Sequence, residues 1–145
     1  MSARLTRRVV IMIIVSSLTL SLTACDGSKT TVIEQAPQVT AANEIAAMAR
    51  LSAIGRAEVA YQTETGGQYA TLDELVERRM VNDPAQGKLT GYKFEIKITA
   101  HGFEATATPE RYGISGKRSF YVDEQNAMRG ADRNGAAATA SDPQV

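Results

Sequence analysis

Few residues of this chain could carry out chemistry by themselves. The 145 residues include a single cysteine, Cys25, and a single histidine, His101, which falls in a predicted turn. One cysteine cannot form an internal disulfide or a cysteine zinc site. A lone histidine in a turn lacks the buried, flanked position that a Ser–His–Asp arrangement requires. We therefore expect no catalytic residues and a protein that is not an enzyme.

Three carboxylates near the C-terminus are the weak candidates for a metal site. Asp123, Glu124 and Asp132 supply oxygen ligands, which calcium prefers. Calcium takes about 6–8 oxygens, and these residues lack the ordered spacing of an EF-hand loop. We expect solvated acids and no cofactor, with calcium binding as the alternative.

The first 25 residues have the three parts of a secretory signal peptide. Arg4, Arg7 and Arg8 form a positive segment, an unbroken apolar run covers 9–15, and small residues precede Cys25. An uncleaved transmembrane helix is the alternative. The apolar stretch ends at residue 24 and is interrupted by serines and threonines, whereas a span needs about 20 apolar residues.

The end of this segment, Leu22-Thr23-Ala24-Cys25, resembles the lipobox of bacterial lipoproteins. The resemblance implies cleavage between Ala24 and Cys25, a diacylglycerol on the cysteine thiol and acylation of the new amine, for example by palmitate. Two or three acyl chains, at roughly 0.8 kcal/mol per buried CH₂, would anchor the chain stably. Asp26 resembles the signal that retains enterobacterial lipoproteins in the inner membrane, which favours its periplasmic face.

Cleavage would also change the charge balance. Residues 1–24 contain three of the 16 basic residues and none of the 16 acidic residues, so the mature chain would have 13 basic side chains and a net charge near −3. Nucleic-acid binders usually show a basic excess. We therefore expect the partners to be the membrane, through the lipid, and envelope proteins, with no nucleic acid. The sequence leaves the oligomeric state open.

The segments after the cysteine divide into a tether, a domain and a tail. Residues 25–39 are polar and contain a proline, which predicts a tether. Good helix formers predict a helix over 40–65, with Thr40 as its N-cap and two glycines after it. Residues 130–145 lack large apolar side chains and predict a flexible tail, which leaves 40–129 as the domain. The apolar stripe of the helix is predicted to comprise Ile45, Met48, Ser52, Gly55 and Val59, widened by Leu51, Ile54 and Tyr61.

The domain is predicted to belong to the α+β class. Thr71 and Glu74 have the capping-box pattern that starts a short helix. Apolar and polar residues then alternate, which predicts strands over 92–99, 103–108 and 118–123, and a short fourth strand over 127–129. Short connections favour an antiparallel meander of three to four strands, with one face covered by the long N-terminal helix.

This order of elements resembles the layout of type IV pilin-like and pseudopilin-like domains. The stretch Gly66–Leu75 (GGQYATLDEL) resembles the G-x-Y-x-T-L-x-E-L stretch of pilin and pseudopilin-like sequences, and Gly91–Phe94, Gly102–Pro109 and Arg118–Glu124 resemble the strands that follow in such proteins. The resemblance covers residues 41–132. A prepilin cleavage site and the apolar, filament-forming half of the helix are replaced by the lipoprotein signal.

These features predict a membrane-anchored envelope lipoprotein. Its pilin-like domain would bind other proteins, and the resemblance points to components of a type IV pilus or of type II secretion. Two alternatives stay open. One is a minor pilin or pseudopilin with an atypical leader, and the other is a small ligand-binding lipoprotein.

Overall fold

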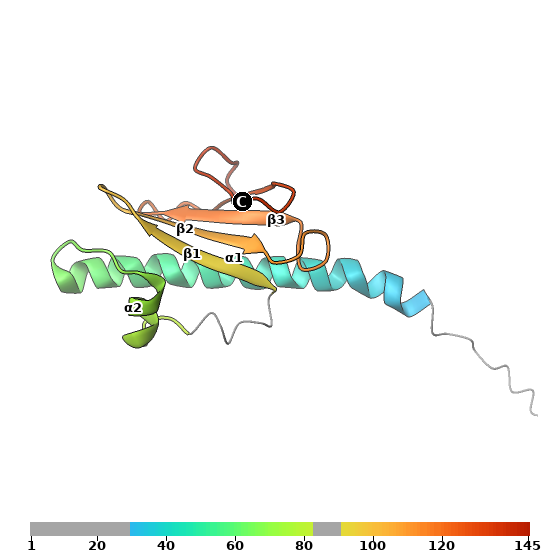
Figure 1. The fold of residues 1–145 in the computed structure, drawn as a ribbon, viewed down its shortest axis with the longest axis horizontal. Helices are drawn as coiled ribbons and strands as arrows, with labels where there is room; N and C mark the ends of the chain where they lie inside the picture. The colour runs from blue at the N-terminus through green and yellow to red at the C-terminus, as the bar shows by residue number, and fades with distance from the viewer. Residues whose placement is uncertain (1–29, 83–90) are drawn as a thin grey trace, which may run out of the picture.

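The computed structural model describes residues 30–82 and 91–145. Within them, one helix packs on one face of a four-stranded antiparallel sheet, which confirms the α+β class (Figure 1). Strand order follows the chain, β1-β2-β3-β4. The elements are α1 (Thr30–Thr65), α2 (Leu72–Glu77), β1 (Tyr92–Ile98), β2 (Phe103–Pro109), β3 (Arg118–Asp123) and β4 (Arg129–Asp132).

Helix α1 begins ten residues earlier than predicted, so the prediction of a tether is wrong for residues 30–39. Pro37 lies inside the helix. A proline lacks the N–H that would donate within the helix, which costs one hydrogen bond. A helix that has already formed over the following residues gains one hydrogen bond for each residue added at its N-terminal end, and this gain offsets the loss. Thr40 is consequently not an N-cap, and its hydroxyl instead points to the carbonyl oxygen of Ile114, 3.4 Å away. Residues 25–29 lie outside the described residues.

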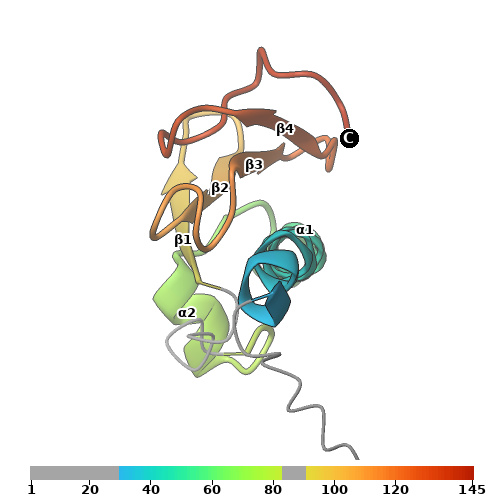
Figure 2. The same cartoon turned by 90° about the vertical axis from the view of Figure 1, so that its right-hand side faces the viewer.

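The buried face of α1 is rotated from the predicted stripe. Ile45 and Val59 are 65% and 44% exposed, whereas the residues that were expected only to widen the stripe form its centre. The rotation arises because α1 packs against two neighbours, the sheet on one side and the segment leading into α2 on the other (Figure 2). The fully or nearly fully buried positions of this face are Ala47, Leu51, Ile54, Gly55, Ala57, Glu58 and Tyr61.

The first three predicted strands are confirmed to within one residue, whereas the fourth, predicted over 127–129, lies at Arg129–Asp132. Phe103, Ala105 and Ala107 of β2 pack toward α1 without exposure, as alternation predicts. In β3 both faces are buried, because Ser119 and Tyr121 on the outer face are as inaccessible as their inward-facing neighbours. Figure 2 shows why: β3 lies between α1 and the C-terminal segment.

The C-terminal segment is part of the domain, so the prediction of a flexible tail over 130–145 is wrong. Asp142 is 6% exposed and forms a two-pronged ion pair with Arg133, at 2.6 Å from Nη2 and 3.1 Å from Nε. The backbone N–H of Thr139 donates to the same carboxylate at 2.8 Å. Short polar side chains thus hold this segment by hydrogen bonds rather than by an apolar stripe, and composition alone does not reveal such bonds. The domain extends to Val145.

Candidate functional site

The two edges of the sheet differ, and this difference defines the candidate site. The edge at β4 is covered by the end of the chain itself. The N–H of Gly130 donates to the carbonyl oxygen of Pro143 at 3.0 Å, and the N–H of Val145 donates to that of Met128 at 3.2 Å. An antiparallel bridge also joins Arg129 and Gln144. The C-terminal residues therefore cover the first part of this edge and pair with outward-pointing backbone groups of Met128 and Gly130.

The edge at β1 is open. The backbone N–H of Thr99 donates to the carbonyl oxygen of Gly102 at 2.9 Å, and that of Glu110 donates to the carbonyl oxygen of Gly91 at 2.9 Å. The odd-numbered residues of β1 are therefore the ones whose backbone groups bond to β2. Antiparallel pairs alternate, so the backbone groups of Phe94, Ile96 and Ile98 point away from β2. Within residues 30–82 and 91–145, no hydrogen bond reaches these outward-pointing groups. Unpaired backbone of this kind is a template for another strand.

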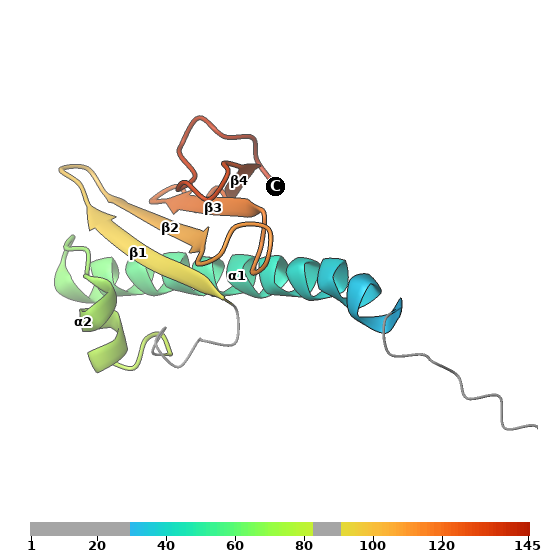
Figure 3. The same cartoon turned by 45° about the vertical axis from the view of Figure 1, so that its right-hand side comes forward.

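A trough runs beside this open edge. One hollow of about 550 Å³ lies between residues 71–73 and the strand residues 93–97. A second, of about 430 Å³, continues along residues 98–102 and has Gln62 and residues 67–69 on its other side. Figure 3 shows β1 at the free margin of the sheet with α2 below it. We call the two hollows together the β1 trough.

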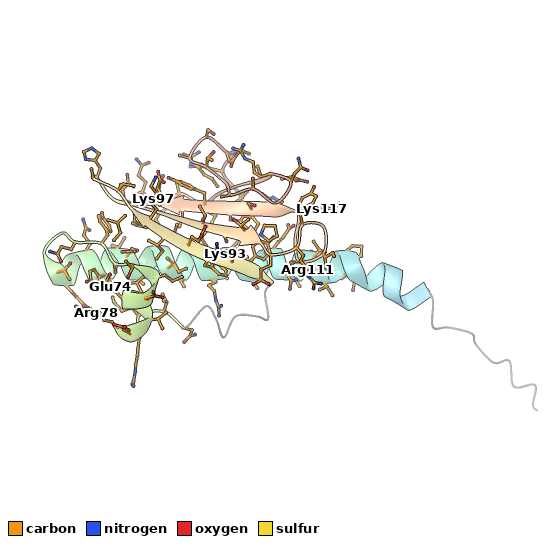
Figure 4. All side chains as sticks on the ribbon, viewed as in Figure 1. Glu74, Arg78, Lys93, Lys97, Arg111 and Lys117 are labelled. Carbon is orange, nitrogen blue, oxygen red and sulfur yellow. The ribbon has the colours of Figure 1, made fainter. Side chains whose placement is uncertain are left out.

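The side chains along the β1 trough alternate between charged and apolar. Lys93, Glu95 and Lys97 face solvent, with side chains 66%, 58% and 78% exposed. Figure 4 labels the two lysines along β1. Lys93 pairs with Glu95 at 2.7 Å, an exposed contact that contributes little to stability. On the other face, Ile96 is half-buried and Ile98 is 46% exposed. The edge thus offers the unpaired main-chain groups that give affinity in strand addition, together with alternating charged and apolar side chains that a partner strand could recognise.

The wall of the trough opposite β1 is fixed by two carboxylates. Glu74 accepts hydrogen bonds from the backbone N–H and the hydroxyl of Thr71, at 2.7 and 2.9 Å, and these bonds lower its pKa. This is the predicted capping box, and it is confirmed. Glu58 was not predicted. It is fully buried on α1 and accepts a hydrogen bond from the N–H of Ala70 at 2.9 Å, while burial raises its pKa. An acid at a core-facing helix position was the only signal that could have revealed it.

The opposite end of the sheet is held by α1. The loop before β3 and the first residue of that strand present the N–H groups of Lys117 and Arg118 to one carboxylate oxygen of Glu44, at 3.0 and 3.2 Å. The hydroxyl of Tyr92 donates to the carbonyl oxygen of Arg118 at 2.7 Å, and burial, followed by the charge of Glu44, raises the tyrosine pKa. Since Glu44 already occupies these donors, this loop is a structural junction.

The predicted calcium ligands do not converge. Asp132 pairs with Arg118 at the start of β3, whereas Asp123 ends that strand and Glu124 follows it. Five residues of strand at about 3.3 Å each separate the two ends by roughly 16 Å. Asp132 instead accepts a hydrogen bond from Tyr112 at 3.0 Å. In the part of the chain that the structure describes, no three acidic, histidine or cysteine side chains form a metal-binding group.

The remaining predicted residues fall into two groups. His101 lies exposed in the β1–β2 turn, as predicted, where it borders the β1 trough. Ala24, Cys25 and Asp26 lie outside the described residues.

Comparisons of the chain with protein-family models, with curated proteins and with solved structures find no match. Among the helices of residues 30–82 and 91–145, none has the length and apolar character needed to cross a membrane.

The fold and the surface together define an α+β domain with one open sheet edge. The described residues form an α+β domain in which a helix covers one face of an antiparallel sheet. One edge of that sheet is covered by the C-terminal segment, and the other is open beside a trough.

Proposed function

We propose that this chain is a lipid-anchored envelope protein whose pilin-like domain binds another protein by strand addition at β1. The anchor rests on the lipobox that ends at Cys25, and the pilin-like assignment on the order of α1, α2 and the meander. The observation that carries the binding function is the contrast between the two sheet edges. A chain that covers β4 with its own end and leaves β1 open retains one site for a partner strand.

The direction of α1 supports display away from the membrane. Its first residue, Thr30, follows Cys25 by only five positions, so the N-terminal end of the domain would lie near the lipid. The turn between β1 and β2 lies at the other end of α1 (Figure 1). The β1 trough would therefore run away from the membrane surface and face other envelope proteins. Because of the pilin resemblance, we propose components of a type IV pilus or of type II secretion as partners.

Site-specific photo-crosslinking in cells tests this proposal. A photoreactive residue at position 97 lies at the β1 trough, and the matched control at position 117 replaces another exposed lysine near the opposite end of the sheet (Figure 4). We expect the probe at 97 to crosslink to a partner chain, either a pilus or secretion component or a second copy of this chain, and the probe at 117 not to. Equal crosslinking at both positions, or none at position 97, would contradict the proposal.

The early start of α1 favours one second candidate, a minor pilin or pseudopilin with an atypical leader. In such proteins a long helix precedes the sheet, and α1 is ten residues longer than the sequence predicted. The two candidates differ at the N-terminus. A lipid-modified Cys25 supports the first, and a methylated amine at another residue supports the second.

A further inference from the structure

We infer that the strand that pairs with β1 is β1 of a second copy of this chain, in antiparallel orientation about a two-fold axis at Ile96. This inference rests on the proposed function, because it names the partner of the same open edge. Two copies of a strand related by a two-fold axis present the same surface to each other. The pair of strands can therefore form only if that surface is complementary to itself. The sequence of β1, YKFEIKI, has this property.

The charges of β1 select among the possible registers. Pairing about Glu95 would place this residue opposite its own copy and Lys93 opposite Lys97 of the partner strand. Both contacts are between like charges, which destabilise a cross-strand pair. Pairing about Phe94 or about Ile96 places a lysine opposite a glutamate twice. In the first case the pair is Lys93 with Glu95, and in the second it is Glu95 with Lys97.

The exposed apolar side chain of β1 distinguishes the two favourable registers. Pairing about Ile96 places Ile98, which is 46% exposed, opposite Phe94 of the other copy and covers it. Pairing about Phe94 leaves Ile98 beyond the paired residues. The register about Ile96 therefore buries apolar surface in addition to forming the two ion pairs, and aromatic with β-branched pairs stabilise neighbouring strands.

The same register satisfies the backbone. Residues 94, 96 and 98 point their N–H and C=O groups away from β2. In this register, residue 94 of one copy lies opposite residue 98 of the other, and the two copies of residue 96 lie opposite each other. All these pairs can exchange backbone hydrogen bonds. The lysines of β1 disfavour pairing with other strands. Against a strand without carboxylates at the matching positions, the lysine ammonium groups would have no opposite charge to pair with. A second copy supplies those carboxylates by symmetry.

Charge-reversal variants test the inference on the mature, lipidated chain in detergent micelles, by sedimentation velocity. The wild-type chain is expected to form a concentration-dependent dimer. Lys97→Glu and Glu95→Lys each turn both Glu–Lys contacts into like-charge contacts, and each should raise the dimer Kd by about tenfold or more. An equimolar mixture of the two variants restores two Glu–Lys contacts and should form a heterodimer close to wild-type affinity.

The mixture keeps the test independent of folding defects, because two variants that fail to fold would not rescue each other. Lys93→Glu is the matched control: in the Ile96 register this residue faces Thr99 of the partner, and the dimer should be retained. A monomeric wild-type chain, a mixture that does not associate, or a larger effect at Lys93 than at Lys97 would each overturn the inference. A monomer that still crosslinks through position 97 to another envelope protein would leave the proposed function standing.

Discussion

The buried carboxyl of Glu58 offers the sharpest test of how the wall of the β1 trough is held. Its side chain is completely inaccessible, one oxygen accepts the N–H of Ala70 at 2.9 Å, and the other has no partner among the described residues. Ala70 is itself fully buried. Replacing Glu58 therefore changes the stability of the segment that joins α1 to α2, without touching β1.

The size of the effect follows from these contacts. In Glu58→Ala, the N–H of Ala70 loses its acceptor, at a cost of about 1–3 kcal/mol, but removal of the unpartnered oxygen relieves a penalty of similar size. The remaining loss is the packing of one methylene, at about 0.8 kcal/mol, together with the cavity that this methylene and the carboxyl group leave. We expect the free energy of unfolding to fall by about 1–3 kcal/mol. Glu58→Gln keeps the acceptor and the shape and should be far milder.

The pH dependence separates burial of an acid from simple packing. Burial raises the pKa of Glu58 above its ordinary value of 4.5. Below that value both folded and unfolded chains hold the proton. As the pH rises, the unfolded chain ionises first, so wild-type stability declines until the pH passes the raised pKa of the folded state. Glu58→Gln lacks this decline, and its stability relative to wild type should increase with pH.

Urea unfolding of wild type and Glu58→Gln between pH 4 and 8 measures this difference. The expected result is a gap that widens in favour of Gln from about pH 4.5 upward. Parallel stability curves, or a Gln variant that loses stability with pH as steeply as wild type, would refute the assignment of Glu58 as a buried acid with a raised pKa.

Three further changes test other parts of the domain. Thr71→Ala removes the N-cap of α2 and should lower stability by about 0.5–2 kcal/mol in urea unfolding. Gly116→Ala places a Cβ against the hydroxyl of Tyr92 and should cost about 1–3 kcal/mol, with a tyrosine signal that shifts in near-ultraviolet circular dichroism. Deleting residues 139–145 uncovers β4, so the amide of Gly130 should exchange with deuterium much faster while the amides of β2 keep their protection.

The strands were predictable because one physical pattern dominates them. In β1 and β2, apolar residues alternate with polar ones, since one face meets α1 and the other meets solvent, and the predicted bounds differ from the observed ones by at most one residue. The capping box of α2 was predictable for a similar reason: Thr71 and Glu74 satisfy each other locally. Local hydrogen bonds and one-sided burial both leave a short-range signature in the sequence.

The errors arose where tertiary contacts decide the outcome. The helix face depends on how α1 divides its surface between the sheet and the segment before α2, and a small rotation exposed Ile45 and buried Glu58. The C-terminal segment is ordered by the ion pair between Arg133 and Asp142, two polar residues that composition assigns to solvent. The meander predicts that β1 and β4 are the two edge strands, but the sequence does not show that the C-terminal segment covers β4 and leaves β1 open.

The N-terminus of the mature chain tests the central claim most directly, since display of the domain from a membrane depends on it. Intact-mass and N-terminal peptide mass spectrometry of the protein purified from membranes is the measurement. We expect a chain that begins at Cys25 and carries a diacylglycerol on the thiol, with a fatty acid on the amine. A chain that retains residues 1–24, or one that begins at another residue without lipid, would contradict it.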